Sequence, residues 1–160
     1  MPGPSKDRLT PRITTTAKLL WGVYLLLSIS EALLLRFVGG MGWFDAVCHT
    51  FTTMATGGFS TRSASIGAFD SVAVDLIITA FMFLAGINFS LHYHALTGKP
   101  GRYFKDAEFR FYGGLLLIAI FIVSIHLFAS GWDTFLTSLR HAAFTVVSIV
   151  TTTGFSTADF

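Results

Sequence analysis

Charged side chains are scarce in this sequence. Asp, Glu, Lys and Arg make up 12% of the 160 residues, whereas soluble domains carry about 25%. This composition argues against an ordinary soluble domain. The net charge of +2 is too small to indicate a nucleic-acid partner. The single cysteine, Cys48, excludes an internal disulfide and leaves no thiolate spacing for a metal.

The residue arrays that enzymes use are also missing. The sequence has no Ser/His/Asp array, no phosphate-binding glycine loop and no paired-carboxylate site. A helix would turn His92 and His94 about 200° apart, so a shared metal is not expected. His49 and His141 are expected to pack or cap rather than coordinate a metal. We therefore predict no enzymatic activity and no cofactor.

Long apolar runs dominate the sequence instead. Hydrophobic residues make up 52% of the chain, and apolar runs cover about 17–38, 72–96 and 109–130. Each matches the roughly 20 residues that cross a bilayer as a helix. Glu31 interrupts the first run, and an acid there normally faces protein or water; a hydrogen bond to a neighbouring helix is the simpler interpretation. The runs predict an all-α membrane protein.

Two shorter apolar segments, 43–54 and 135–150, are too short to span a membrane and suit re-entrant helices. A polar, glycine-rich loop follows each one, at 55–61 and 151–157. Gly154 lies 96 residues after Gly58, and both glycines precede the tripeptide Phe-Ser-Thr. This repeat predicts span, pore helix, filter loop and span as the structural unit, with a site built between units.

The predicted organisation has four parts. Residues 1–13 form a cytoplasmic, mostly extended N-terminal segment, and 14–97 form a complete pore unit. Residues 98–108 form a cytoplasmic loop, and 109–160 form a partial second pore unit. Eight of the eleven Lys and Arg residues lie in or beside 1–18 and 98–110, which places both regions in the cytoplasm and opens the loops to the outside.

The two loops have the chemistry of a cation-selectivity filter. Non-helical backbone at membrane depth must line water or be buried in protein. Carbonyl groups of such a loop can replace the hydration shell of an alkali ion. Each loop also follows a helix C-terminus, whose negative dipole end favours a cation. The alternative is that each loop is an ordinary interhelical turn capped by Thr and Ser. The presence of two copies at equivalent places argues against this alternative. The candidate ion-binding residues are Thr56, Gly57, Gly58, Phe59, Thr152, Thr153, Gly154 and Phe155.

Four stretches resemble the Trk/Ktr/HKT superfamily of potassium uptake proteins, closest to the bacterial TrkH branch. The resemblance covers nearly the whole chain and is specific at both loops. The stretches are Arg8-Leu9-Thr10-Pro11-Arg12, Phe44-Asp45-Ala46-Val47-Cys48-His49, Ala55-Thr56-Gly57-Gly58-Phe59-Ser60-Thr61 and residues 145–155, TVVSIVTTTGF.

The resemblance implies four such units around one pore, with one filter glycine from each. Gly58 and Gly154 fall at two of these positions, and this chain resembles the second unit and most of the third, as a fragment of a longer protein. Glycine there goes with potassium, whereas sodium-favouring members tend to carry serine at the first filter. The resemblance also implies a location in the cell inner membrane, a homodimer and a cytosolic nucleotide-binding regulatory subunit.

The sequence therefore predicts potassium uptake through a filter of backbone carbonyls, with potassium and membrane lipid as its partners. Two other functions stay open. One is a small cation channel formed when this chain oligomerises, and the other is a membrane scaffold or assembly subunit that transports nothing.

Overall fold

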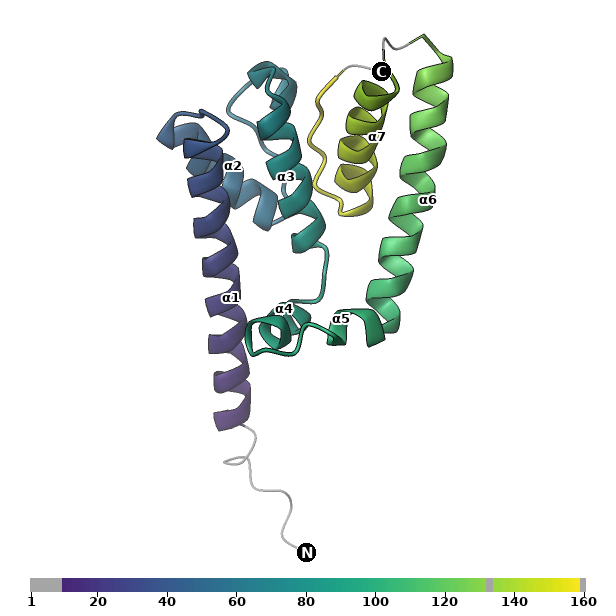
Figure 1. Cartoon of the computed structure of the whole chain (residues 1–160). Coiled ribbons are helices and arrows are strands. Elements are labelled where there is room, and N and C mark those ends of the chain that lie inside the picture. Colours follow the sequence, from purple (N-terminus) through teal and green to yellow (C-terminus); the bar gives the residue numbers. More distant parts are fainter. Residues whose placement is uncertain (1–9, 132–133, 159–160) are drawn as a thin grey trace, which may run out of the picture.

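The computed structural model describes residues 10–131 and 134–158, and its regular elements are all helical. Figure 1 shows long helices at the two sides of the molecule, with shorter helices and their loops between them. The elements are α1 (Thr10–Phe37), α2 (Trp43–Met54), the 3-10 helix η2 (Ser65–Phe69), α3 (Val72–Ala85), α4 (Phe89–Leu96), α5 (Arg102–Lys105), α6 (Ala107–Ala129) and α7 (Phe135–Val150).

Two helices in the described residues, Thr14–Phe37 and Ala107–Ala129, are long and apolar enough to cross a membrane alone. The two halves of the chain repeat one arrangement: α1 packs against the short helix α2, and α6 packs against the short helix α7. Both short helices have the bounds that the sequence predicts for pore helices, Trp43–Met54 and Phe135–Val150.

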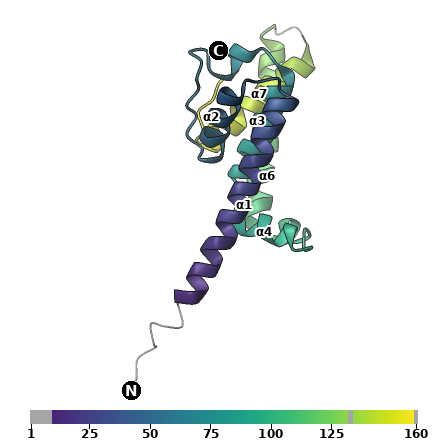
Figure 2. The same ribbon diagram turned by 90° about the vertical axis from the view of Figure 1, so that its left-hand side faces the viewer.

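The second span expected over 72–96 is not one continuous helix. The structure has two helices there, α3 and α4, which meet at an angle of 101° and together are long and apolar enough for one broken span. The polar side chain of Asn88 starts the second helix, because its Oδ1 accepts a hydrogen bond from the Ser90 amide at 3.0 Å. The apolar composition of 72–96 gives no signal of this break in the sequence. Figure 2 shows α4 on the opposite side of α1 from α2 and its loop.

Two other boundaries also differ from expectation. Helix α1 begins at Thr10, so residues 10–13 are helical rather than extended. Pro11 is compatible with this start because proline is tolerated in the first turn of a helix. The loop expected over 98–108 contains α5, and Asp106 then caps α6, its Oδ1 accepting from the Phe109 amide at 2.9 Å.

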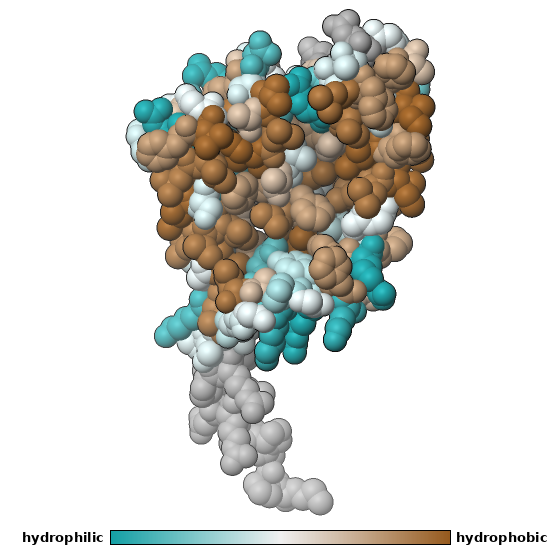
Figure 3. All heavy atoms as spheres, in the orientation of Figure 1, coloured by the Kyte–Doolittle hydropathy of each residue, from teal (hydrophilic) through white to brown (hydrophobic). Residues whose placement is uncertain are grey.

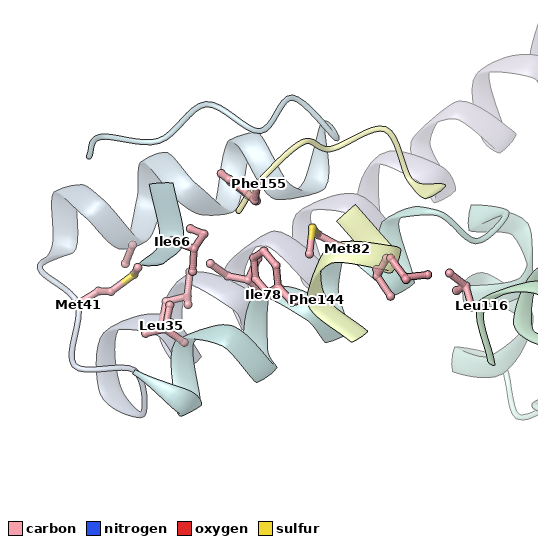
Figure 4. Packing of buried hydrophobic residues seen from close by; sticks show 12 residues of the cluster. Leu35, Met41, Ile66, Ile78, Met82, Leu116, Phe144 and Phe155 are labelled. Atoms are coloured by element: carbon pink, nitrogen blue, oxygen red, sulfur yellow. The ribbon is translucent and has the colours of Figure 1, made fainter. Parts of the chain in front are cut away.

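One apolar core joins the two halves of the chain. Leu35 of α1, Ile78 and Met82 of α3 and Phe144 of α7 belong to the same buried cluster, together with Phe155 from the loop after α7 (Figure 4). Helix α3 also packs directly on α7, and Asp75 pairs with Arg140 across this contact at 3.6 Å. The loops after α2 and α7 are therefore held in one packed body.

The outward surface of the long helices is apolar. Figure 3 shows a broad hydrophobic band across the molecule and a hydrophilic cluster at its lower end. On α6 the exposed residues include Leu117, Ile118, Phe121 and Ile122. A contiguous apolar surface of this kind marks contact with membrane or protein, and its position on helices of spanning length indicates the membrane.

Candidate functional site

The two glycine-containing loops have the same backbone form. Thr56 and Gly58 have φ angles of 50° and 65°, and Thr152 and Gly154, at the equivalent positions, have 61° and 86°. The residue between each pair does not have a positive φ. A threonine with positive φ is strained and persists only where its surroundings hold it. Both loops are therefore held in a specific, alternating conformation.

Equivalent hydrogen bonds turn each loop at the end of its helix. The amides of Gly57 and Gly58 both donate to the carbonyl of Thr52, at 2.7 and 3.3 Å. The amides of Thr153 and Gly154 both donate to the carbonyl of Ser148, at 2.9 and 3.3 Å. These hydrogen bonds satisfy two amides of each loop and one carbonyl in the last turn of each helix.

The loop carbonyls, in contrast, remain available. Within the described residues, the carbonyls of 56–58 and 152–154 accept no hydrogen bond. Two loops with three carbonyls each that accept no hydrogen bond within the described residues can offer these oxygens as ligands to a cation.

A hydroxyl group holds the outer part of each loop. Thr52 Oγ1 donates to the carbonyl of Phe59 at 2.8 Å, and Ser148 Oγ donates to the carbonyl of Phe155 at 2.7 Å. Thr52 and Ser148 are themselves 96 residues apart. Neither residue is among the predicted ion-binding residues, although the repeat offset that matches the two glycines also pairs Thr52 with Ser148.

Side chains in the N-terminal half of each short helix hold the far end of each loop. Thr61 Oγ1 donates to Asp45 Oδ1 at 2.6 Å, and Thr157 Oγ1 lies 2.9 Å from His141 Nδ1. Asp45 and His141 again occupy equivalent positions. The Thr61 hydrogen bond, aided by the nearby Arg62, lowers the pKa of Asp45, so this carboxylate stays charged at neutral pH.

Replacing Thr52 with Val or Ser148 with Ala is expected to loosen the corresponding loop. Each change removes one side-chain hydrogen bond, typically worth about 1 kcal/mol, without adding bulk. We expect faster amide hydrogen exchange over 56–61 in the first variant and over 152–157 in the second. Exchange that rises equally in both loops, or in neither, would contradict a separate anchor for each loop. Thr97→Val, which removes an exposed hydroxyl in another loop, is the control.

The two loops meet directly. A Cβ atom added to Gly58 would lie 1.8 Å from the carbonyl oxygen of Thr153 and 3.2 Å from the carbonyl carbon of Gly154. The second loop is also tied to the η2 segment, because the Gly67 amide donates to the Ser156 carbonyl at 3.1 Å. The structure thus brings the predicted glycine positions of both loops into one site.

The equivalent phenylalanines have different environments. Phe155 is 3% exposed and packs near His49, with 5.9 Å between ring centroids, whereas Phe59 is 78% exposed. Phe155 thus inserts into the first half of the chain. Phe59 has no comparable pocket among the described residues.

Glu31 is fully buried on α1, which packs against the pore helix α2. Thr53 of the neighbouring helix α2 interacts with the Glu31 carboxyl group, as the simpler expectation has it, although neither carboxyl oxygen has a hydrogen-bond partner of regular geometry among the described residues. Thr50 of α2 is also buried, and its hydroxyl likewise lacks a partner there. Glu31 therefore faces the pore helix α2 and is not part of the first loop itself.

The histidines serve separate structural contacts. His92 bonds the carbonyl of Leu84 at 2.9 Å and the Tyr103 hydroxyl, whereas His94 contacts Arg102 at 2.7 Å. His49 contacts the Asp45 carbonyl and Ser60 Oγ. The described residues contain no group of three or more His, Cys, Asp or Glu that could hold a metal ion.

Paired units of a long apolar helix, a short helix and a polar loop, with free carbonyls where the loops meet, define an all-helical membrane protein built like a potassium-channel pore. Comparison with known proteins agrees. A family model described as TrkH, cation transport protein, matches residues 3–160, and the chain belongs to this family. The resemblance seen in the sequence is thereby confirmed.

The chain is similar to several curated transport proteins. It is 50% identical over 162 residues to the Trk system potassium uptake protein TrkH of Halomonas elongata, covering 100% of this chain and 33% of that protein. It is 46% identical over 160 residues to TrkH of Salmonella typhimurium, covering 98% of this chain and 33% of that protein. The chain thus spans about one third of the length of these relatives.

A solved structure shares the fold. The crystal structure of the potassium transporter TrkH from Vibrio parahaemolyticus aligns with a TM-score of 0.87 and 39% identity, over 92% of this chain and 32% of that chain. The predicted all-α membrane fold is confirmed by this match and by the helices described above. The names of these relatives are those of transporters, which agrees with the prediction of no enzymatic activity.

Proposed function

We propose that this chain carries potassium across a membrane as part of a Trk-type transporter, and that its two loops form two walls of the selectivity filter. The observation that carries the proposal is the meeting of two equivalent loops with free carbonyls at 56–58 and 152–154. These oxygens would replace the hydration shell of the ion. The carbonyls of Phe59 and Phe155, held by Thr52 and Ser148, complete each wall at its outer end.

The short helices favour a cation at this place. Helix α2 ends at Met54 and α7 ends at Val150, each immediately before its loop. The C-terminal end of a helix carries a partial negative charge. Both helices therefore lower the potential at the junction of the loops without placing a carboxylate in the ion path.

The completed filter would have four walls, as the family resemblance implies. The exposed ring of Phe59 supports this arrangement, because Phe155 at the equivalent position fills a pocket of the preceding unit. A further unit that packs against the first half as the first half packs against the second would cover Phe59 in the same way.

Orientation and partners follow from the same proposal. The uneven distribution of Lys and Arg supports a cytoplasmic 97–110 segment and loops that open outward from a cell inner membrane. The homodimer and the cytosolic nucleotide-binding regulatory subunit are proposed on the family resemblance.

The test is potassium uptake by the full protein in cells that lack other uptake systems. We expect growth at low external potassium, and we expect Gly154→Ser to reduce the preference for potassium over sodium in radiotracer uptake. Gly154 has a φ of 86°, yet an added Cβ there meets no atom within 4 Å, so the substitution disturbs the backbone without a direct clash. Gly113→Ser, on α6 and also with open space around it, is the matched control.

Two results would overturn the proposal. Failure of the well-expressed protein to support growth would favour a scaffold without transport. Unchanged selectivity in Gly154→Ser, with normal uptake, would remove the second loop from the filter.

A further inference from the structure

A polar pocket of about 410 Å³ lies between α4 and α5, far along the chain from both loops. Its lining includes Arg102, Lys105 and His94. The Arg102 guanidinium donates to His94 Nε2 at 2.7 Å, so one of the two cationic groups is held in a defined position. The pocket therefore presents an ordered positive charge.

The acid in the lining does not cancel this charge. Asp106 Oδ1 already accepts the Phe109 amide at 2.9 Å as the cap of α6. Arg102 and Lys105 are exposed and supply two positive charges against this one carboxylate. The guanidinium group matches phosphate oxygens with two parallel hydrogen bonds, and a lysine adds a point charge.

The pocket lies where a membrane surface would be. Helix α6, which is long enough to span, begins at Ala107, directly after Asp106. Figure 3 shows the apolar band above this level and the hydrophilic cluster below it. Leu96 and Phe104, on the segments that form the pocket, are large exposed hydrophobic residues, and Phe104 is 76% exposed.

The pocket also lies away from the ion path. In Figure 2, α4 projects from α1 on the side opposite to α2 and the loops. An anion held there would not meet the carbonyls at 56–58. The neighbouring surface is the apolar exterior of the long helices, which is suited to acyl chains.

We propose that this pocket binds the phosphate headgroup of an anionic phospholipid, such as phosphatidylglycerol. Two basic groups at the level of the headgroups, one of them held by His94, with apolar surface directly beside them, are the features that such a lipid requires. A free phosphate ion would use the two basic groups but not the apolar surface. Bound lipid would hold α4 and α5 together at the break in the second span, beside the contact between His92 and Leu84.

The experiment measures lipid binding to the full protein in mild detergent by native mass spectrometry. Phosphatidylglycerol and phosphatidylethanolamine are titrated in parallel. We expect tighter binding of phosphatidylglycerol, and binding on the order of tenfold weaker in the Arg102→Gln/Lys105→Gln double variant. The control is Lys99→Gln/Arg110→Gln, which removes the same charge from exposed residues outside the pocket lining. It is expected to stay within about threefold of the unchanged protein.

Three outcomes would overturn the proposal. Equal losses in the two double variants would show a general attraction of basic residues for the membrane. Equal affinity for the two lipids would exclude recognition of the anionic headgroup. Full displacement of phosphatidylglycerol by millimolar inorganic phosphate would identify a site for soluble anions. The melting temperature of each variant is measured as well, and it must match that of the unchanged protein. If the melting temperature of Arg102→Gln/Lys105→Gln is lower, the double variant Arg102→Lys/Lys105→Gln is used in its place.

Discussion

Gly58→Ala is expected to lower potassium uptake by about tenfold or more. The added Cβ would lie 1.8 Å from the Thr153 carbonyl oxygen, so the two loops cannot keep their contact. The φ of 65° adds strain of about 1–3 kcal/mol for a residue with a side chain, and about 1.4 kcal/mol at a rate-limiting barrier already lowers a rate tenfold. The measurement is rubidium uptake at matched expression in cells that depend on this protein.

Gly57→Ala is the matched control in the same loop. Its added Cβ would meet the Phe59 ring at 3.6 Å, an ordinary contact, and Gly57 does not have a positive φ. Its uptake should remain within about twofold of the unchanged protein, since surface changes without strain usually cost under about 0.5 kcal/mol. If Gly57→Ala were as damaging as Gly58→Ala, the contact between the loops would not be the cause.

Phe155→Ala is expected to destabilise the protein by about 3 kcal/mol, the lower end of the range for this change in a core. The ring is 3% exposed and belongs to the cluster that joins both halves of the chain. The lower end applies because removing apolar contact costs less when lipid rather than water is the surrounding solvent. The measurement is thermal or denaturant unfolding of the purified protein in one detergent, followed by a near-ultraviolet spectrum.

Phe121→Ala provides the comparison for Phe155→Ala. Phe121 lies on α6 and is 61% exposed on the apolar exterior. Its removal leaves no buried cavity, so the unfolding midpoint should stay close to that of the unchanged protein. Equal destabilisation by the two changes would show that Phe155 does not anchor the second loop in the core. Selective loss of uptake in Phe155→Ala at temperatures below unfolding would link this anchor to the filter.

These two expected results concern one physical link between packing and transport. The second loop carries its carbonyls on one side and Phe155 on the other, so the core holds the loop in place. The first loop then closes against it through Gly58, where the absence of a side chain permits backbone contact. A filter held this way depends on backbone geometry rather than on charged side chains.

Much of the local structure could be predicted from composition and repetition. The short helices end at Met54 and Val150 as expected, because a polar glycine-rich loop follows an apolar segment at both places. The break in 72–96 could not be predicted from the apolar run. It depends on the Asn88 cap and on contacts from distant residues such as Tyr103, which bonds His92 of α4.

The sequence by itself determined the all-helical membrane fold, the two equivalent loops, and the equivalent positions of Gly58 and Gly154 in them. These features depend on local periodicity, on hydropathy and on the conformational freedom of glycine, all of which are written in consecutive residues. Only the tertiary structure decided that Gly58 contacts Thr153, that Phe155 is buried while Phe59 is exposed, and that Arg102 is held beside His94. Those contacts arise when separate helices pack together, and the pattern of any single segment does not encode them.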